Sequence, residues 1–203
     1  MIQFDNCFNY FHKKFFSYLN AEKYEINKNV LWIAGGAVRD YFSSSMKKTD
    51  IDIFCVSGTV FKNICDDIQE KGGIQVYENE NTIRYLLNKI NIDVVKKFFD
   101  TPIDCINSFD FTVSMFACGY NGEIFYGTTS FIDLAKKQIM INKITYPLST
   151  LHRLLKYQNK GFRICKGELF KIAVSINEMT DLVIKDEKIE ENISLSDIIM
   201  DIS

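Results

Sequence analysis

The sequence predicts an α+β fold, in which helices and strands are mixed along a chain of 203 residues. Two observations lead to this prediction. Phenylalanines recur every three or four residues near the N-terminus, which is the spacing of an amphipathic helix. Further along, short apolar runs end at glycine or asparagine turns, which is typical of β-strands. A chain of this length suits one domain, or one domain with a small appended unit.

The elements can be placed in order along the chain. In the first half we expect a helix over 2–19, a strand over 29–34 with a helix directly after it, a strand over 50–55, a helix over 60–71, and strands over 73–77, 82–87 and 89–97. In the second half we expect a return strand over 123–126 and helices over 147–160 and 168–176. Periodicity does not settle the type of segment 109–119, and the chain from 180 onward is a short helix or a loose tail.

Composition and charge exclude several classes of protein. Hydrophobic residues make up 47% of the chain and charged residues 25%, so it can bury a core and is not disordered as a whole. No apolar run reaches the roughly 18–20 residues that a membrane span needs. The N-terminus lacks a signal-peptide cleavage site. The net charge of −2 excludes a strongly basic nucleic-acid-binding protein. We therefore expect a cytoplasmic protein without a membrane partner.

The cysteines do not form a metal-binding or redox motif. No two of the six are spaced as C-x-x-C, and neither histidine lies close to a pair of them. Without a secretory signal, the expected state is a set of buried free thiols. The six positions are Cys7, Cys55, Cys65, Cys105, Cys118 and Cys165.

Charge is distributed unevenly. Residues 136–171 contain nine basic residues and one acid, whereas residues 180–203 contain seven acids and two lysines. Two readings remain open: ordinary solvated faces, or a surface that faces phosphates and is partly offset by the acidic tail. Arginine is scarce beside 20 lysines, which favours its use where two parallel hydrogen bonds matter. For Arg84, an ordinary charge on a strand face is an equally open interpretation.

A glycine pair between a strand and a helix is a candidate phosphate site. Gly35 and Gly36 follow an apolar strand, and glycine lets backbone N–H groups approach a phosphate closely. Arg39 is expected in the first turn of the following helix, where its guanidinium can bind a phosphate through two hydrogen bonds. Asp40, in the same turn, suits the positive end of the helix dipole. We assign nucleotide binding to these four residues.

Three aspartates are candidate metal ligands. Asp50 and Asp52 begin a predicted strand, and alternation places both side chains on one face. Two carboxylates on one face suit a hard cation such as Mg²⁺. Asp93 lies in a later predicted strand, opposite the apolar side chains of Ile92 and Val94. Phosphoryl chemistry at a metal pair needs a third carboxylate, and Asp93 is the candidate.

The order G-G-A-V-R-D over 35–40 and D-I-D over 50–52 resembles a known family. It is similar to the head of class II CCA-adding enzymes and bacterial poly(A) polymerases, in the polymerase-beta-type nucleotidyltransferase superfamily. Further segments continue the resemblance. They are N-I-D-V-V over 91–95, the segments 104–117 and 122–137, and more weakly 150–162.

The resemblance implies a fold and a reaction. It implies a nucleotidyltransferase head over 1–145, a mixed sheet flanked by helices, followed by a short helical, neck-like segment with an acidic tail over 146–203. The implied reaction transfers a nucleoside monophosphate from a nucleoside triphosphate, such as ATP, to a hydroxyl at an RNA 3′ end. Asp50, Asp52 and Asp93 would be the catalytic residues and would hold two Mg²⁺ ions about 3.5–4 Å apart. Nucleotide-binding roles would extend to Asp110, Arg153 and Lys156.

Two departures from the family pattern leave other functions open. Ser108 and Phe109 stand where the family has two arginines, and a 203-residue chain lacks room for the family's tRNA-gripping body. A second hypothesis therefore keeps the chemistry with a small molecule or a protein as acceptor. A third is a nucleotidyltransferase fold that has lost catalysis and serves as a binding or assembly protein.

Overall fold

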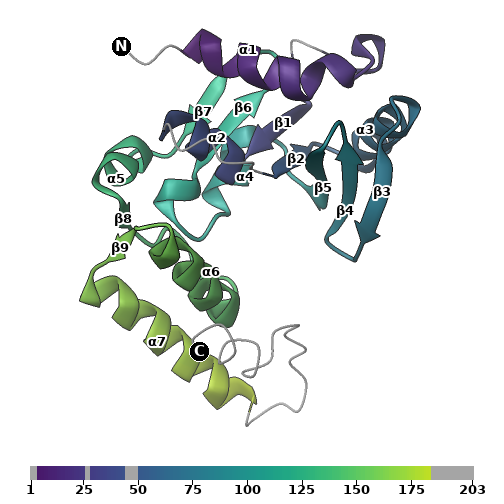
Figure 1. Ribbon diagram of the computed structural model, residues 1–203. Helices are drawn as coiled ribbons and strands as arrows, with labels where there is room; N and C mark the ends of the chain where they lie inside the picture. Colours follow the sequence, from purple (N-terminus) through teal and green to yellow (C-terminus); the bar gives the residue numbers. More distant parts are fainter. Residues whose placement is uncertain (1–3, 26–27, 44–49, 184–203) are drawn as a thin grey trace.

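The computed structural model of the protein describes residues 4–25, 28–43 and 50–183 (Figure 1). Its strands are β1 Leu31–Ala34, β2 Ile51–Cys55, β3 Ile74–Glu78, β4 Thr82–Leu87, β5 Ile90–Phe98, β6 Phe116–Gly119, β7 Ile124–Tyr126, β8 Gln138–Ile139 and β9 Arg163–Ile164. Its α-helices are α1 Phe4–Lys14, α2 Gly36–Phe42, α3 Gly58–Glu70, α4 Pro102–Asn107, α5 Ser130–Lys136, α6 Pro147–Asn159 and α7 Lys166–Val183. Three short 3₁₀ turns cover Phe16–Tyr18, Ala21–Lys23 and Thr112–Ser114.

A seven-stranded mixed sheet forms the centre of the fold, with the strand order β3-β4-β5-β2-β1-β6-β7. β2 and β5 run parallel, and the other neighbouring strands of this sheet are antiparallel. β8 and β9 form a separate two-stranded sheet, below which α6 and α7 lie in Figure 1. The predicted α+β fold, a mixed sheet flanked by helices, is confirmed.

Most of the predicted elements are present, and several differ from expectation. The first helix ends at Lys14, and the chain turns at Phe15 so that both Phe15 and Phe16 are buried. The unsettled segment 109–119 contains a 3₁₀ turn followed by β6. α4 was not predicted, although Thr101 caps it and a proline begins it. α7 is longer than expected, and residues 184–203 of the expected tail lie outside the described residues.

The two faces of the large sheet differ in what covers them. One face packs against α1, α2 and α3 in the main core, which includes Leu31, Ile33 and Ile53. The alternate residues Trp32 and Phe54 face the other side, in a smaller apolar cluster under α4. That cluster includes Phe54 of β2 but none of the charged residues of β2, β4 and β5. Charged side chains of β2, β4 and β5 can therefore stand on the remainder.

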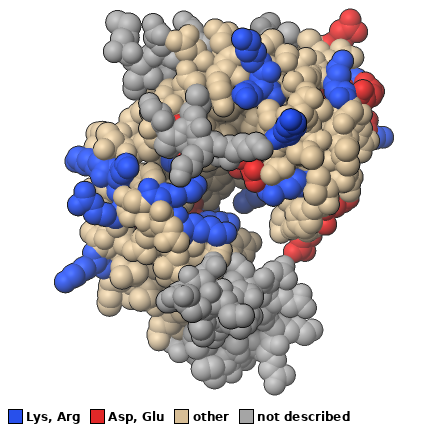
Figure 2. All heavy atoms as spheres, viewed as in Figure 1, with Lys and Arg blue, Asp and Glu red and all other residues tan. Residues whose placement is uncertain are grey.

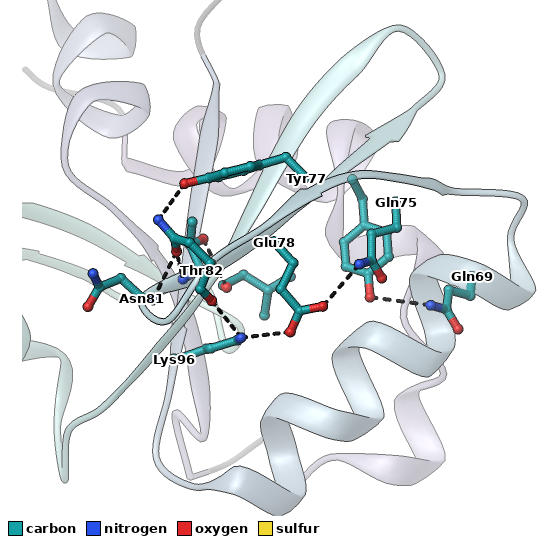
Figure 3. Close-up of polar contacts among 10 residues, drawn as sticks. Gln69, Gln75, Tyr77, Glu78, Asn81, Thr82 and Lys96 are labelled. Carbon is teal, nitrogen blue, oxygen red and sulfur yellow. Dashed lines mark hydrogen bonds and ion pairs between the residues drawn. The ribbon is translucent and has the colours of Figure 1, made fainter.

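Side-chain contacts hold the outer hairpin of β3 and β4 against β5 (Figure 3). Lys96 Nζ donates hydrogen bonds to Glu78 Oε1 at 2.7 Å and to the carbonyl oxygen of Asn79 at 2.6 Å. Gln75 Nε2 donates to the other carboxylate oxygen of Glu78 at 3.0 Å. In the turn, Asn79 Oδ1 accepts from the backbone N–H of Thr82 at 2.8 Å. These contacts fix the register in which β4 meets β5.

Two buried acids attach peripheral segments to the domain. Glu168 Oε2 accepts the backbone N–H of Ile141 at 2.8 Å, which ties α7 to the chain after β8. Asp67 of α3 is 1% exposed and accepts hydrogen bonds from the backbone N–H of Asn20 at 2.8 Å and from Tyr24 Oη at 2.7 Å. Lys23 Nζ lies 2.5 Å from its other oxygen. The segment after α1 is therefore held by one carboxylate.

None of the described helices is long and apolar enough to span a membrane.

Replacing Asp67 by alanine should lower the free energy of unfolding by about 2–4 kcal/mol, because a buried hydroxyl and a backbone N–H lose their acceptor. Urea unfolding followed by circular dichroism measures this change. The control is Glu70→Ala, which removes an exposed carboxylate 3.6 Å from the same lysine and should change stability by less than about 0.5 kcal/mol. Equal effects of the two substitutions would contradict this role of Asp67.

Candidate active site

A row of charged side chains crosses the uncovered part of the large sheet. The strand register places Arg84 of β4 opposite Asp93 of β5, and Asp93 opposite Asp52 of β2. Asp50 directly precedes β2 and stands two residues from Asp52, which is the spacing of side chains on one strand face. The isoleucines of β2 that alternate with these acids are buried in the main core. We call Asp50, Asp52, Asp93 and Arg84 the charged row.

Arg84 lies between two of the three predicted metal ligands. Its Nε donates to Asp93 Oδ1 at 2.7 Å and its Nη2 to Asp93 Oδ2 at 2.6 Å. The same Nη2 lies 3.1 Å from Asp50 Oδ2, and Asn91 Nδ2 donates to Asp50 Oδ1 at 3.0 Å. Within the described part of the chain, Asp52 accepts no hydrogen bond. Of the three carboxylates, that of Asp52 therefore has the oxygens freest to meet a ligand.

The surroundings of Asp52 favour its neutral form. Burial raises the pKa of this carboxyl group to about 7, and the nearby carboxylates of Asp93 and Asp50 add to the rise. Arg84 opposes the rise through its positive charge. A bound cation would reverse the balance, because it would stabilise the ionised carboxylate. The ionisation of Asp52 thus depends on what the site holds.

The charged row forms one wall of a cavity of about 450 Å³, and α6 forms the opposite wall. Arg153 and Lys156 of α6, with Lys160 directly after its last residue, follow one another at steps of three and four and bring positive charge to that wall. Figure 2 shows basic side chains gathered beside a hollow in the middle of the molecule. The cavity is lined by Gly36, Arg39, Asp50, Asp52, Arg84, Asp93, Arg153, Lys156, Tyr157 and Lys160.

The structure corrects the expected environment of Arg39 and Asp40. α2 begins at Gly36, so Asp40 lies beyond its first turn and pairs with Arg39 Nε at 2.6 Å. Arg39 is 2% exposed, and its Nη1 donates to Tyr157 Oη of α6 at 2.5 Å. Its guanidinium also lies 5.0 Å from the centre of the Tyr157 ring. Arg39 thus borders the cavity and also attaches α6 to α2.

Glycine at position 35 brings the backbone close to the charged row. Gly35 has a φ of 77°, a backbone conformation that residues other than glycine rarely adopt. A Cβ atom there would lie 3.9 Å from Asp52 Oδ2 and 3.8 Å from the ring of Phe109. The backbone at Gly35 therefore lies close to Asp52, and the predicted approach of this backbone to a phosphate stays a prediction.

Ser108 and Phe109 have structural contacts in place of the charges that the resemblance predicts. Ser108 Oγ donates to the carbonyl oxygen of Cys105 at 2.7 Å where α4 ends. The ring of Phe109 packs against that of Phe54 in a tilted arrangement, with ring centres 5.9 Å apart. Asp110, which follows, is 8% exposed.

The remaining predicted site residues lie on α6 or contact it. Arg153 Nη1 donates to Asp110 Oδ2 at 2.5 Å, so this pair joins α6 to the segment after α4. Lys156 lines the cavity one turn further along. Lys160 was missing from our predicted site. Burial lowers its pKa most, and the positive charges of Arg39 and Lys156 lower it further. An anion in the cavity would relieve this repulsion.

The donor set can be compared with what a metal ion needs. The charged row offers carboxylate oxygens, which hard cations such as Mg²⁺ prefer. However, no three acid, histidine or cysteine side chains converge into a ready metal site among residues 4–25, 28–43 and 50–183. All six cysteines are free; five are buried and Cys165 is exposed. The residue types therefore fit a divalent cation, while the three carboxylates are not gathered around one point.

Comparison with known proteins identifies the family. The model of the Gabija anti-defense 2 family matches residues 4–137. The chain belongs to this family. A protein named Gabija anti-defense 2, from Bacillus phage SPbetaL7, is 28% identical over 174 residues, which cover 82% of this chain and 42% of that protein. The chain thus spans less than half the length of this relative.

Solved structures with a similar fold are CCA-adding enzymes. The Thermotoga maritima CCA-adding enzyme complexed with tRNA has a TM-score of 0.56 at 20% identity, over 75% of this chain and 40% of that enzyme. A CCA-adding enzyme in complex with ATP has a TM-score of 0.56 at 22% identity, over 73% and 39% of the two chains. The nucleotidyltransferase-like fold is therefore shared. The family itself differs from the CCA-adding enzyme that the sequence motifs resemble.

The raised pKa of Asp52 predicts a pH dependence of stability for the metal-free protein. Between about pH 4 and pH 7 the folded state holds a proton on Asp52 that the unfolded state has lost. The contribution of this group to the free energy of unfolding should therefore fall by about 2–4 kcal/mol as the pH rises through this range. Urea unfolding at several pH values in EDTA measures it. Asp52→Asn should remove this fall, and identical pH slopes in both proteins would show that Asp52 titrates normally.

Proposed function

We propose that this protein is a Mg²⁺-dependent nucleotidyltransferase that transfers a nucleoside monophosphate from a nucleoside triphosphate to a hydroxyl, with an RNA 3′ end as acceptor. The observation that carries the proposal is a cavity with carboxylates on one wall and basic side chains on the other. A nucleoside triphosphate with its cation presents both charges that such a cavity complements. The volume of about 450 Å³ is within the range of small-molecule sites.

The carboxylates would hold the cation. Asp50, Asp52 and Asp93 are the residues that the proposal assigns to Mg²⁺. When bound there, Mg²⁺ would lower the pKa of the acceptor hydroxyl and neutralise charge on the phosphates. The half-buried position of Asp52 keeps its carboxylate away from bulk water, which strengthens its attraction to a cation.

The wall formed by α6 would bind the triphosphate. Lys156 and Lys160 face the cavity and supply positive charge to the phosphate oxygens. Arg153 is held at Asp110, which fixes the direction of its guanidinium. Arg39 keeps α6 in place through Tyr157. In the reaction, the hydroxyl releases its proton to water and its oxygen forms a bond to the α-phosphorus, while the bond from the α-phosphorus to the bridging oxygen breaks and pyrophosphate leaves. The protein contributes mainly position and charge.

Similar structures support the nucleotide part of the proposal. CCA-adding enzymes of this fold have been solved with CTP, with ATP and with tRNA. Their identity to this chain is 20–22%, and the chain covers about two fifths of their length, so they support the fold rather than the acceptor. An RNA 3′ end is the acceptor we propose, and a small molecule or a protein side chain is the alternative.

A second candidate function is supported by specific observations. The name of the family indicates a role against the Gabija defence, which a phage protein could perform by binding a protein partner. Arg84 already pairs with Asp93 and Asp50, and Ser108 and Phe109 stand in place of the expected arginine pair. These features suit a nucleotidyltransferase fold that binds rather than catalyses. In both candidates the protein acts against a host defence.

Asp52→Ala should lower nucleotide transfer by at least about 100-fold, because the freest carboxylate of the charged row is removed. Purified protein is incubated with each labelled nucleoside triphosphate, Mg²⁺, and either total RNA or total protein from the host. Label in RNA supports the proposed acceptor, and label in protein supports the alternative. Lys97→Met is the control, since Lys97 is on β5 but outside the cavity and lies over the ring of Phe99.

The same two variants separate catalysis from binding in infected cells. Protection of a phage from a Gabija-carrying host should be lost with Asp52→Ala and kept with Lys97→Met. If Asp52→Ala protects as well as the wild type and no triphosphate yields labelled product, the transferase proposal is contradicted and the binding role is supported.

A further inference from the structure

Arg84 stands where a cation would be expected. Its Nε and Nη2 form two parallel hydrogen bonds with the oxygens of Asp93, at 2.7 and 2.6 Å, and Nη2 also lies 3.1 Å from Asp50. A guanidinium bound in this way occupies the side of the carboxylate that a metal ion would use for bidentate binding. Arg84 therefore takes a position in the charged row that would otherwise be open to an ion.

The strand pairing keeps Arg84 in this position. Its neighbours Ile83 and Tyr85 are 9% and 1% exposed and point into the core. The hydrogen bonds of β4 to β5 place the Arg84 backbone directly opposite Asp93. The contacts of Lys96 with Glu78 and Asn79 close the hairpin beside it. Because the backbone is held on both sides, the guanidinium cannot leave the acids by a shift of β4.

The net charge of the charged row is zero with one divalent cation bound, and positive with two. Asp50, Asp52 and Asp93 carry three negative charges when all are ionised. Arg84 supplies one positive charge, and one divalent cation supplies the other two. A second divalent cation would leave an excess of positive charge within a few ångströms of the guanidinium, where like charges repel strongly in a partly buried site.

We propose that the charged row binds a single divalent cation, through Asp52 together with Asp50 or Asp93, and that Arg84 takes the place of a second ion. The proposal rests on the proposed function for the assignment of a cation to these acids. It goes beyond it in the number of ions and in the role of Arg84. Arg84 is here a residue that positions Asp93 and replaces a metal charge.

The test counts metal ions in the absence of any nucleotide. Mn²⁺ is titrated into the purified chain at neutral pH, and free Mn²⁺ is measured by electron paramagnetic resonance, with calorimetry as a second readout. The wild type should bind one Mn²⁺ at the charged row. Arg84→Met, which keeps the length and removes the charge and the donors, should bind a second ion, or bind the first at least about tenfold more tightly.

Control variants make the result specific. Lys97→Met removes one positive charge from the same sheet outside the cavity and should bind one Mn²⁺ with wild-type affinity. Asp52→Asn should lose the wild-type ion. Circular dichroism and thermal unfolding establish that each variant is folded. If Arg84→Met fails to fold, Arg84→Lys serves in its place, since it keeps the charge without the fork and should still bind only one ion.

Three outcomes would overturn the inference. Binding of two Mn²⁺ ions by the wild type would contradict only the proposal that Arg84 takes the place of a second ion, and it would leave the proposed transferase function intact. If Arg84→Met binds the same number of Mn²⁺ ions as the wild type, with the same affinity, Arg84 does not compete with the metal. Absence of binding in both the wild type and Arg84→Met would contradict this inference and also the proposed Mg²⁺-dependent function.

Discussion

The parallel pairing of β2 with β5 is the constraint on which the candidate site depends. It places Asp52 directly opposite Asp93, although the two residues are 41 positions apart in the sequence. Two carboxylates in this position repel one another, and burial raises the cost of ionising Asp52 further. A protein tolerates such an arrangement only with a compensating charge nearby. Arg84, on the neighbouring strand β4, provides part of this positive charge. A bound ligand would have to provide the rest, next to the half-buried carboxyl group of Asp52.

The wall of the cavity formed by α6 depends on two further contacts of arginine side chains. α6 is attached to the sheet side of the cavity by Arg39 through Tyr157 and by Arg153 through Asp110. Both arginines are thus held before any ligand arrives, so they lose little conformational freedom when one binds. Lys160 differs, because its pKa is lowered by burial and by neighbouring cations. The site combines fixed arginines with a lysine whose charge an anion would favour.

Much of this arrangement follows from local patterns in the sequence. Alternation of acids with buried isoleucines predicts that Asp50 and Asp52 share a face, and the glycine pair predicts the backbone turn beside them. Arg84 could not be assigned in this way, because its partner is determined by which strands pair, and a strand-face charge has the same local pattern. Tyr157 gave no signal for the same reason, since its contact with Arg39 joins segments 118 residues apart. The resemblance likewise predicted phosphate contacts for Arg39, whose guanidinium here binds Asp40 and Tyr157.

The charged row depends on the fold and on the residues that stand on it. A nucleotidyltransferase-like fold supplies the pairing that brings the carboxylates together. The chain belongs to the Gabija anti-defense 2 family and not to the CCA-adding enzymes that share this fold. The arginine within the charged row supplies one positive charge among the carboxylates, which lowers the charge that a bound cation would have to balance. Ionised Asp52 lowers the free energy of unfolding while the site holds no ligand, since burial and the nearby carboxylates favour its neutral form. A cation bound beside Asp52 would remove this cost, because it would stabilise the ionised carboxylate.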